Sequence, residues 1–247
     1  MIFFFSLGLG MYLSTETGNG FKLEKAFVAF VLLLSFFFRL RLFDEIKDYA
    51  VDLKYNPTRP LARGVLSVDQ VKLILLVLIF AELIVTALLG KEYFFIHLVA
   101  IFYSLLMFEE FFLGSFLRPR LVMYAVTHTF VSSLSGFSAA LVFSGASLDV
   151  LSQKTILFFV TPWFYFNLFE FARKTYAREE ERSEVETYSL LFGPGGAWAL
   201  SMSQVLLGLG FLHFLNVNKL EYFYVLASVY FLLSLAYLFN KSTRSAK

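Results

Sequence analysis

Long apolar stretches separated by short polar ones run through the whole chain. A helix that crosses a bilayer needs about 20 mostly apolar residues. Seven stretches are long enough by that measure, at residues 24–43, 69–89, 93–113, 120–145, 154–172, 197–216 and 221–240. A shorter apolar run at residues 2–13 has no basic residues before it and no clear cleavage site, so we interpret it as an additional short span. The pattern therefore predicts an all-α, polytopic membrane bundle of about eight transmembrane helices.

The composition supports this interpretation. Of the 247 residues, 58% are hydrophobic and 33 are phenylalanine, which is too apolar for a soluble domain of this size. The absence of cysteine excludes a disulfide scaffold, a thiolate metal site and a cysteine nucleophile. The net charge is only +2, so the positions of the charged residues are more informative about topology than their sum. We expect the lipid bilayer, and no nucleic acid, as a partner.

Lysine and arginine gather in alternate connections between the apolar stretches. The basic segments are residues 39–63, 118–120, 173–182 and 241–247. The remaining connections are short and poor in base, at residues 14–23, 90–92, 146–153 and 217–220. By the positive-inside rule the basic segments face the cytoplasm. Because no convincing sequence repeat is present, we expect one transmembrane domain over residues 1–247.

The most informative polar stretch follows the apolar run at residues 24–43. It carries four carboxylates, those of Asp44, Glu45, Asp48 and Asp52. On a helix this spacing places all four on one face about 100° wide. Acids at the C-terminal end of a helix oppose its macrodipole, and like charges one turn apart repel by a few tenths of a kcal/mol. We therefore interpret the four carboxylates as a site for a hard divalent cation such as Mg²⁺. In the alternative, they lie at a solvated helix end and are neutralised by Arg41, Lys47 and Lys54.

This stretch resembles the first signature of the UbiA superfamily of intramembrane prenyltransferases. The acids are followed by Arg59-Pro60-Leu61 and then Gly64, as in that signature, although Asp44-Glu45 stands where the family usually has Asn-Asp. The family places its two motifs after the second and sixth helices, which agrees with the predicted spans. The resemblance covers nearly the whole chain and implies a UbiA-like fold. The family usually has nine helices, and we expect this sequence to lack the last one.

The resemblance implies a metal site and a substrate class. In the family, the first-motif carboxylates bind Mg²⁺ that bridges to the diphosphate of an allylic polyprenyl donor. This implies catalytic and metal-binding roles for Asp44, Glu45, Asp48 and Asp52. A diphosphate leaves readily only when its developing charge is neutralised, and Arg59 and Arg63 are close enough in sequence to contribute.

The second motif departs from the family pattern of several Asp residues. This chain has Asn167, Glu170, Arg173 and Lys174, of which only Glu170 is a carboxylate. We assign Glu170 a catalytic role and Asn167 a role in substrate binding. Arg173 and Lys174 bind the diphosphate directly in one interpretation, because both side chain types bind phosphate well. In the alternatives this half of the site is degraded, or the two cations are only positive-inside anchors.

Four further candidates for substrate binding lie near the fourth and fifth spans. Arg118 and Arg120 match loosely a basic pair that the family uses for diphosphate, and topology anchoring explains them equally well. Tyr124 and His128 are one helical turn apart and therefore share a face. A lone histidine of this kind is more often a hydrogen-bonded packing residue than a base.

Two acids lie within apolar stretches, where ionisable residues are usually functional or paired. Glu110 follows Tyr103 and Met107 along the span predicted at residues 93–113, and we assign it to the substrate cavity. Glu82 lies deep in the preceding span, and the sequence names no partner for it.

We therefore predict Mg²⁺-dependent transfer of a prenyl group from a polyprenyl diphosphate to a lipophilic acceptor, at a cytoplasm-facing intramembrane cavity. A CDP-alcohol phosphotransferase would need Asp-Gly and Ala-Arg before its paired acids, and neither dipeptide is present there. A divalent-cation carrier would place acids at mid-membrane on broken helices. A catalytically silent relative that binds lipid or assists assembly stays open, because the second motif is altered.

Overall fold

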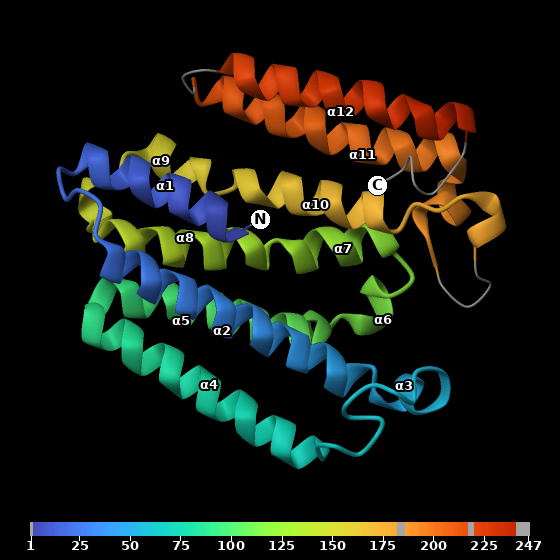
Figure 1. The fold of residues 1–247 in the computed structure, drawn as a ribbon, viewed down its shortest axis with the longest axis horizontal. Coiled ribbons are helices and arrows are strands. Elements are labelled where there is room, and N and C mark those ends of the chain that lie inside the picture. The colour runs from blue at the N-terminus through green and yellow to red at the C-terminus, as the bar shows by residue number, and fades with distance from the viewer. Residues whose placement is uncertain (1, 182–185, 217–219, 241–247) are drawn as a thin grey trace. The chain divides into compact units, whose positions relative to one another are not determined.

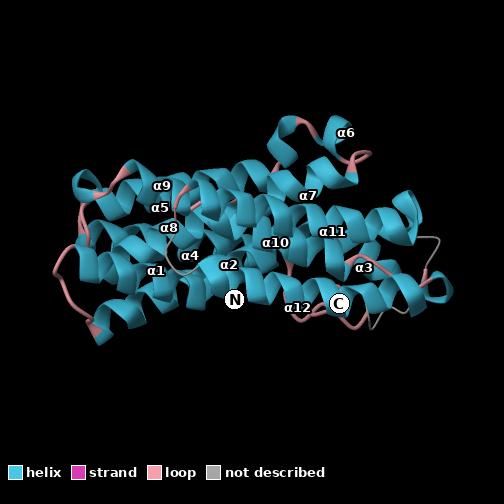
Figure 2. Ribbon diagram, turned by 90° about the horizontal axis from the view of Figure 1, so that it is seen from above, coloured by secondary structure: helices cyan, strands magenta, loops and turns pink. Residues whose placement is uncertain are grey.

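The computed structural model describes residues 2–181, 186–216 and 220–240, and the described part contains helices and loops without a strand (Figure 2). The intervening residues 182–185 and 217–219 and the basic tail at 241–247 lie outside the described residues. The chain divides into two compact units, and each is described by itself. The first comprises Met1–Phe112 and Leu134–Leu151, and the second comprises Leu113–Ser133 and Ser152–Lys247. The expectation of one transmembrane domain stays a prediction.

The first unit contains six α-helices and two 3₁₀ turns among its described residues (Figure 1). In chain order they are α1 (Ile2–Glu16), α2 (Leu23–Lys47), α3 (Tyr49–Tyr55), α4 (Val68–Leu89), α5 (Lys91–Phe108), η1 (Glu110–Phe112), α8 (Val131–Ser144) and η2 (Leu148–Val150). A capping box starts α4, since Ser67 and Gln70 each bond the other's backbone N–H. Helix α4 ends at Gly90, whose φ of 147° is accessible to glycine at no steric cost.

Two apolar clusters hold α2 in place within the first unit. Towards its N-terminal end, buried Ala29 and Leu33 pack with Val142 and Phe143 of α8. Towards its C-terminal end, Phe43 packs with Leu61 of the following loop and with Val71 and Leu75 of α4. The second cluster fixes both the end of α2 and the loop after α3, so it positions the acidic stretch.

The second unit is built around α10 and α11, which pack against each other. Its elements are α6 (Gly114–Leu117), α7 (Leu121–Thr129), α9 (Gln153–Phe158), α10 (Thr161–Arg173), η3 (Arg178–Glu180), α11 (Tyr188–Phe214) and α12 (Leu220–Asn240). Helix α7 packs on α10, and α12 packs on α11 (Figure 1). Ala125, Phe171, Tyr188 and Ala197 form a buried cluster that joins α7, α10 and α11.

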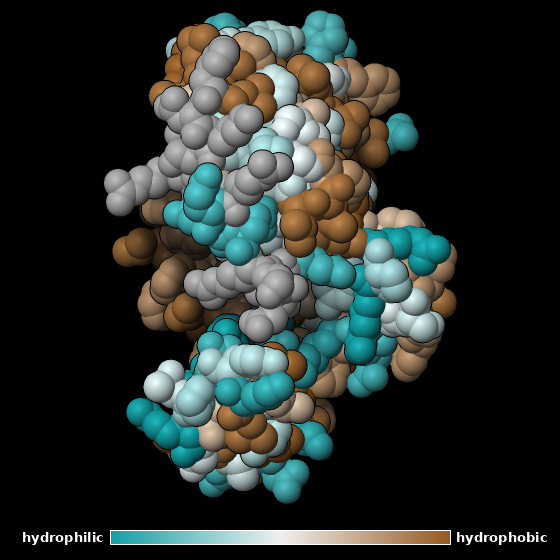
Figure 3. All heavy atoms as spheres, turned by 90° about the vertical axis from the view of Figure 1, so that its right-hand side faces the viewer, coloured by the Kyte–Doolittle hydropathy of each residue, from teal (hydrophilic) through white to brown (hydrophobic). Residues whose placement is uncertain are grey.

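Seven helical segments of the described chain are long and apolar enough to cross a membrane, and they coincide with the seven predicted spans. The shorter run at residues 2–13 is also helical, within α1. Large apolar side chains stand exposed along these helices, for example Leu73, Phe80 and Ile84 on α4, as expected where lipid replaces water. Figure 3 views the side of Figure 1 on which α3 lies, and polar side chains are frequent there. The predicted all-α, polytopic organisation is therefore confirmed.

Several predicted boundaries were wrong for local backbone reasons. Helix α5 ends at Phe108 and not at residue 113, because Glu110, Phe111 and Phe112 have φ angles of 51°, 54° and 56°. Consecutive left-handed residues other than glycine are costly and cannot continue an α-helix. The bounds of the predicted spans 120–145 and 154–172 agree with the structure, and each span consists of two consecutive helices. These are α7 and α8 in the first span and α9 and α10 in the second, where Pro162 lies in the first turn of α10.

The glycine-rich segment before the predicted span 197–216 interrupts the helix at Gly193. Helix α11 begins at Tyr188 and consists of two helical parts that meet at a kink at Gly193, where φ is 70° and ψ is 170°. Glycine adopts this backbone without a steric penalty, and the kink accommodates the missing N–H of Pro194.

Candidate functional site

The acidic stretch spans a break between two helices of the first unit. Helix α2 ends at Lys47, and Asp48 lies between α2 and α3 with φ −86° and ψ −2°. The predicted helical face with four carboxylates is therefore interrupted at Asp48, although the backbone of that residue stays in the right-handed helical region. Asp44 is exposed at the end of α2, whereas Glu45 and Asp52 are buried. Backbone hydrogen bonds one turn long continue across the break, from the N–H of Asp48 to the carbonyl of Asp44 and from the N–H of Asp52 to the carbonyl of Asp48, both at 2.8 Å.

Three of the four carboxylates converge on one cation. The Nη1 atom of Arg59 lies 2.8 Å from Oδ2 of Asp52. It also lies 3.9 Å from both Oε1 of Glu45 and Oδ2 of Asp48. Asn56 donates a hydrogen bond of 2.9 Å to the other oxygen of Asp52. The arginine that was expected to assist the diphosphate therefore neutralises the acids themselves, as a charge-assisted contact allows.

The loop after α3 explains why Arg59 reaches the acids. Leu61 is buried against α2 and α4, and the chain turns at Gly64, where φ is 76°. Arg63 is exposed, and its backbone N–H bonds the carbonyl of Arg59 at 2.8 Å. The Arg-Pro-Leu segment is thus anchored by its leucine, while the guanidinium of Arg59 points back to the acids.

The donor atoms of this cluster suit a hard divalent cation, although they are not arranged as a finished metal centre. No group of three or more His, Cys, Asp or Glu side chains in the described part of the chain is arranged to hold a metal ion. However, the buried Oε2 atom of Glu45 has no hydrogen-bond partner among the described residues. Its other oxygen bonds Arg41 and faces Arg59. Carboxylate oxygens are the ligands that Mg²⁺ prefers, so Glu45, Asp48 and Asp52 fit such an ion chemically.

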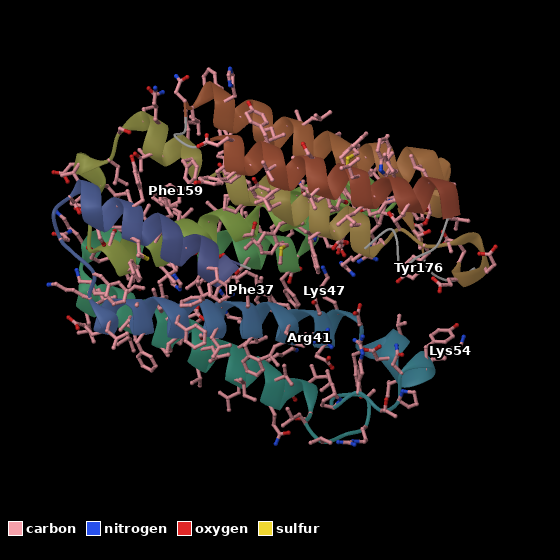
Figure 4. The ribbon with its side chains drawn as sticks, turned by 45° about the horizontal axis from the view of Figure 1, so that its top comes forward. Phe37, Arg41, Lys47, Lys54, Phe159 and Tyr176 are labelled. Atoms are coloured by element: carbon pink, nitrogen blue, oxygen red, sulfur yellow. The ribbon has the colours of Figure 1, made fainter. Side chains whose placement is uncertain are left out.

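Glu110 belongs to the same end of the first unit. It is buried, and its Oε1 atom lies 3.3 Å from Nζ of Lys47, in the last turn of α2. Figure 4 shows Lys47 and Arg41 on this part of α2 and Lys54 on α3. The left-handed backbone that begins at Glu110 ends α5 and places this carboxylate beside Lys47. The sequence pointed to Glu110 but not to Lys47 as its partner.

A buried charge network lies on the first unit's spans, and sequence reasoning missed it. The Oε2 atom of Glu82 on α4 lies 3.4 Å from Nη2 of Arg39 on α2 and 3.2 Å from Nε2 of His97 on α5. All three side chains are almost completely buried. The negative charge of Glu82 is balanced by the positive charge of Arg39, which is how buried charges are normally tolerated. The available signal was the presence of charges inside three separate apolar stretches.

Serine hydroxyls complete this network. Ser35 donates to Oε1 of Glu82 at 2.6 Å, and Arg39 donates to Ser104 at 2.7 Å. The Nδ1 atom of His97 lies 2.8 Å from the hydroxyl of Ser138 on α8. The network therefore joins four helices at membrane depth.

In the second unit, Asn167 makes interhelical hydrogen bonds. It accepts a hydrogen bond from Thr129 of α7 and donates one of 3.2 Å to Gln204 of α11. Since Asn167 is also buried, its amide contributes to the packing of α7, α10 and α11.

Glu170 is held by the two cations that follow it. Arg173 donates from Nε and Nη2 to its two carboxylate oxygens at 2.5 and 2.8 Å. Lys174 lies 3.5 Å away through Nζ, so the pairing expected from their one-turn spacing is present. The group as a whole has one negative and two positive charges.

The remaining candidates also lie in the second unit. Tyr124 and His128 do share a face, since their rings stack with centroids 3.8 Å apart. The Nδ1 atom of His128 donates to the backbone carbonyl of Tyr124 at 2.7 Å. Arg118 and Arg120 are exposed, and the guanidinium of Arg120 lies 4.0 Å above the ring of Phe116.

Comparison with known proteins identifies the family. The model of the UbiA prenyltransferase family matches residues 2–247. Neither the curated proteins nor the solved structures contain a significant match to the chain. The family match covers almost the full length and includes the acidic stretch, the loop that carries Arg59 and the seven membrane-spanning segments. This integral membrane protein therefore belongs to the UbiA prenyltransferase family.

Proposed function

We propose that this protein transfers a prenyl group from a polyprenyl diphosphate to a lipophilic acceptor and that Mg²⁺ is required. Family membership supports prenyl transfer within a membrane. The observation that carries the finer proposal is the convergence of Glu45, Asp48 and Asp52 on the guanidinium of Arg59. This arrangement stabilises positive charge beside the end of a membrane span, where a diphosphate head group with its metal ion would bind.

The acidic stretch is the proposed metal site. Glu45, Asp48 and Asp52 would hold Mg²⁺, together with Asp44 at the exposed end of α2. When bound, Mg²⁺ supplies positive charge that stabilises the leaving diphosphate. Because Arg59 now neutralises these carboxylates, we propose that it exchanges partners when the metal binds, and that its guanidinium then contacts phosphate oxygen. Arg63, exposed on the same loop, is a second candidate for this contact.

We propose that the basic residues stabilise the diphosphate as it leaves. The C–O bond of the allylic donor breaks with both electrons passing to the diphosphate, the acceptor attacks the resulting cation, and a proton leaves the acceptor. Positive side chains lower the barrier because they stabilise the charge that develops on the leaving group. In the second unit we assign this role to Arg173 and Lys174, which Glu170 holds in place. Arg118, Arg120, Tyr124, His128 and Glu110 are further proposed binding residues.

The distribution of basic residues supports a cytoplasmic location for the acidic stretch. Lys47, Lys54, Arg59 and Arg63 surround it, and the positive-inside rule places such segments on the cytoplasmic side. A donor made in the cytoplasm would reach the metal site from that side, and its apolar chain would extend into the bilayer.

The first experiment removes one carboxylate from the proposed metal site. Asp48→Asn or Asp52→Asn in the full chain should weaken Mg²⁺-dependent binding of a non-hydrolysable prenyl diphosphate analogue at least tenfold, about 1.4 kcal/mol. Binding can be measured by calorimetry in detergent. Asp69→Asn is the matched control, because Asp69 is exposed at the start of α4 and outside the cluster. Equal affinity in all three variants would refute the metal assignment.

A further inference from the structure

The phenol of Tyr188 is buried without a hydrogen-bond partner. Its side chain is completely inaccessible, and its hydroxyl has no partner among the residues that the structure describes. The ring is well fixed, since it makes an edge contact with Phe171 at a centroid distance of 5.0 Å. The backbone is fixed too, because the N–H of Tyr188 bonds the carbonyl of Lys174 at 3.0 Å. The hydroxyl is therefore held in a defined place in the second unit.

An unsatisfied hydroxyl at this position opposes folding. Buried polar atoms in native proteins nearly always have a partner, and exceptions call for an explanation such as a bound ligand. Phenylalanine would keep the ring contact with Phe171 and the backbone bond to Lys174, and it would avoid the cost of the buried hydroxyl. Packing alone therefore favours phenylalanine over tyrosine here.

The charged neighbours of the phenol indicate what its partner is. Tyr188 contacts the last turn of α10 through its backbone bond to Lys174 and its ring contact with Phe171, next to Glu170 and Arg173. They flank Phe171 in the last turn of α10, and Lys174 follows directly. Because the two cations share one carboxylate, the group carries a net positive charge and suits an anion. A phenolic O–H is a donor, and the oxygens of a phosphate group are strong acceptors that arginine and lysine also bind.

We propose that the hydroxyl of Tyr188 donates a hydrogen bond to a diphosphate oxygen, as a substrate-binding residue beside Arg173 and Lys174. This inference rests on the proposed function, because it takes the diphosphate as the ligand of these cations. It also explains why a buried hydroxyl is kept without a partner in the protein: the partner arrives with the substrate.

The test is Tyr188→Phe in the full-length protein, with inorganic pyrophosphate and Mg²⁺ as the probe. We expect pyrophosphate to bind about tenfold more weakly, because a hydrogen bond to a charged group is lost. The thermal unfolding midpoint without ligand should be unchanged or higher, because the variant removes a buried polar atom that lacks a partner. Calorimetry measures the first quantity, and thermal unfolding in detergent measures the second.

Tyr237→Phe is the matched control in the same unit. Tyr237 is equally buried, but its hydroxyl donates to the carbonyl of Tyr176 at 3.1 Å. Tyr176 lies in the segment between α10 and α11 (Figures 1 and 4). Loss of the Tyr237 hydroxyl should lower the unfolding midpoint and leave the affinity for pyrophosphate within twofold of the parent.

Two results would overturn the inference. One is pyrophosphate affinity within twofold of the parent in Tyr188→Phe. The other is a lowered unfolding midpoint in that variant, as in the Tyr237 control, which would show that the hydroxyl stabilises the protein itself. The proposed function fails separately, if the parent protein does not bind pyrophosphate with Mg²⁺ or if Asp52→Asn binds it unchanged.

Discussion

Arg59 shows how one side chain can serve two states of a site. In this structure its guanidinium neutralises Asp52 directly and is within 4 Å of Glu45 and Asp48. A divalent cation bound as we propose would therefore compete with Arg59 for the same oxygens. The chain carries its own counter-charge for the acids, which keeps the buried Asp52 and Glu45 tolerable before metal binds.

Removing that counter-charge should make the protein depend on metal for stability. Arg59→Met should cost about 1–3 kcal/mol of folding free energy in the absence of metal, because two buried carboxylates lose a charged partner. For a chain of this size that corresponds to a fall of several degrees in the unfolding midpoint. Millimolar Mg²⁺ should raise the midpoint more in the variant than in the parent. Arg63→Met, on the same loop but exposed, is the control.

The Arg59 prediction has a clear contrary result. If Mg²⁺ raises the midpoints of the parent, Arg59→Met and Arg63→Met equally, then Arg59 and the metal do not share the same carboxylates.

At the scale of elements, the buried network decides how the spans of the first unit fit together. Arg39, Glu82 and His97 lie on α2, α4 and α5, so their contacts fix the relative rotation and depth of three helices. Arg39 lies two turns before the end of α2. By fixing the rotation and depth of α2, the network also fixes the position of Glu45 and of the acidic stretch.

Removing one charged member of the buried network should lower the folding stability strongly. Glu82→Gln leaves Arg39 buried without a negative charge, and removing one member of a buried ion pair costs about 3–5 kcal/mol. The double variant Arg39→Met with Glu82→Gln should recover much of that loss, because no buried charge remains uncompensated. Thermal unfolding of Arg39→Met, Glu82→Gln and the double variant gives the coupling free energy between the two side chains. Strictly additive losses would show that the ion pair does not contribute as a unit.

At the scale of the whole molecule, the basic segments predict which connections face the cytoplasm. The chain has no cysteine, so a single introduced cysteine is the only reactive thiol. Lys54→Cys and Glu179→Cys should resist a membrane-impermeant thiol reagent in intact cells, and Gln153→Cys should react. All three positions are exposed. Modification of Lys54→Cys or Glu179→Cys from outside would contradict the proposed sidedness.

The amino-acid sequence by itself determined the membrane spans and the chemistry of the first motif. Hydropathy is a property of consecutive residues, and a span needs only enough apolar residues in a row, so all seven segments were found. Local spacing also predicted the contacts within a turn, such as Lys174 with Glu170 and Tyr124 with His128. The acid pattern and the Arg-Pro-Leu segment were sufficient to recognise the family that the full-length match shows.

Only the tertiary structure decided which of these residues meet. Asp48 lies between two helices, and the loop after α3 brings Arg59 back to Glu45, Asp48 and Asp52. Glu82 finds its partners on other helices, and the hydroxyl of Tyr188 becomes buried only because α10 and α11 pack together. Such contacts join residues far apart in the chain, and hydropathy and periodicity report only on neighbours along it. The rotation of each helix about its axis, and therefore its partners, is set by packing against the adjacent helices.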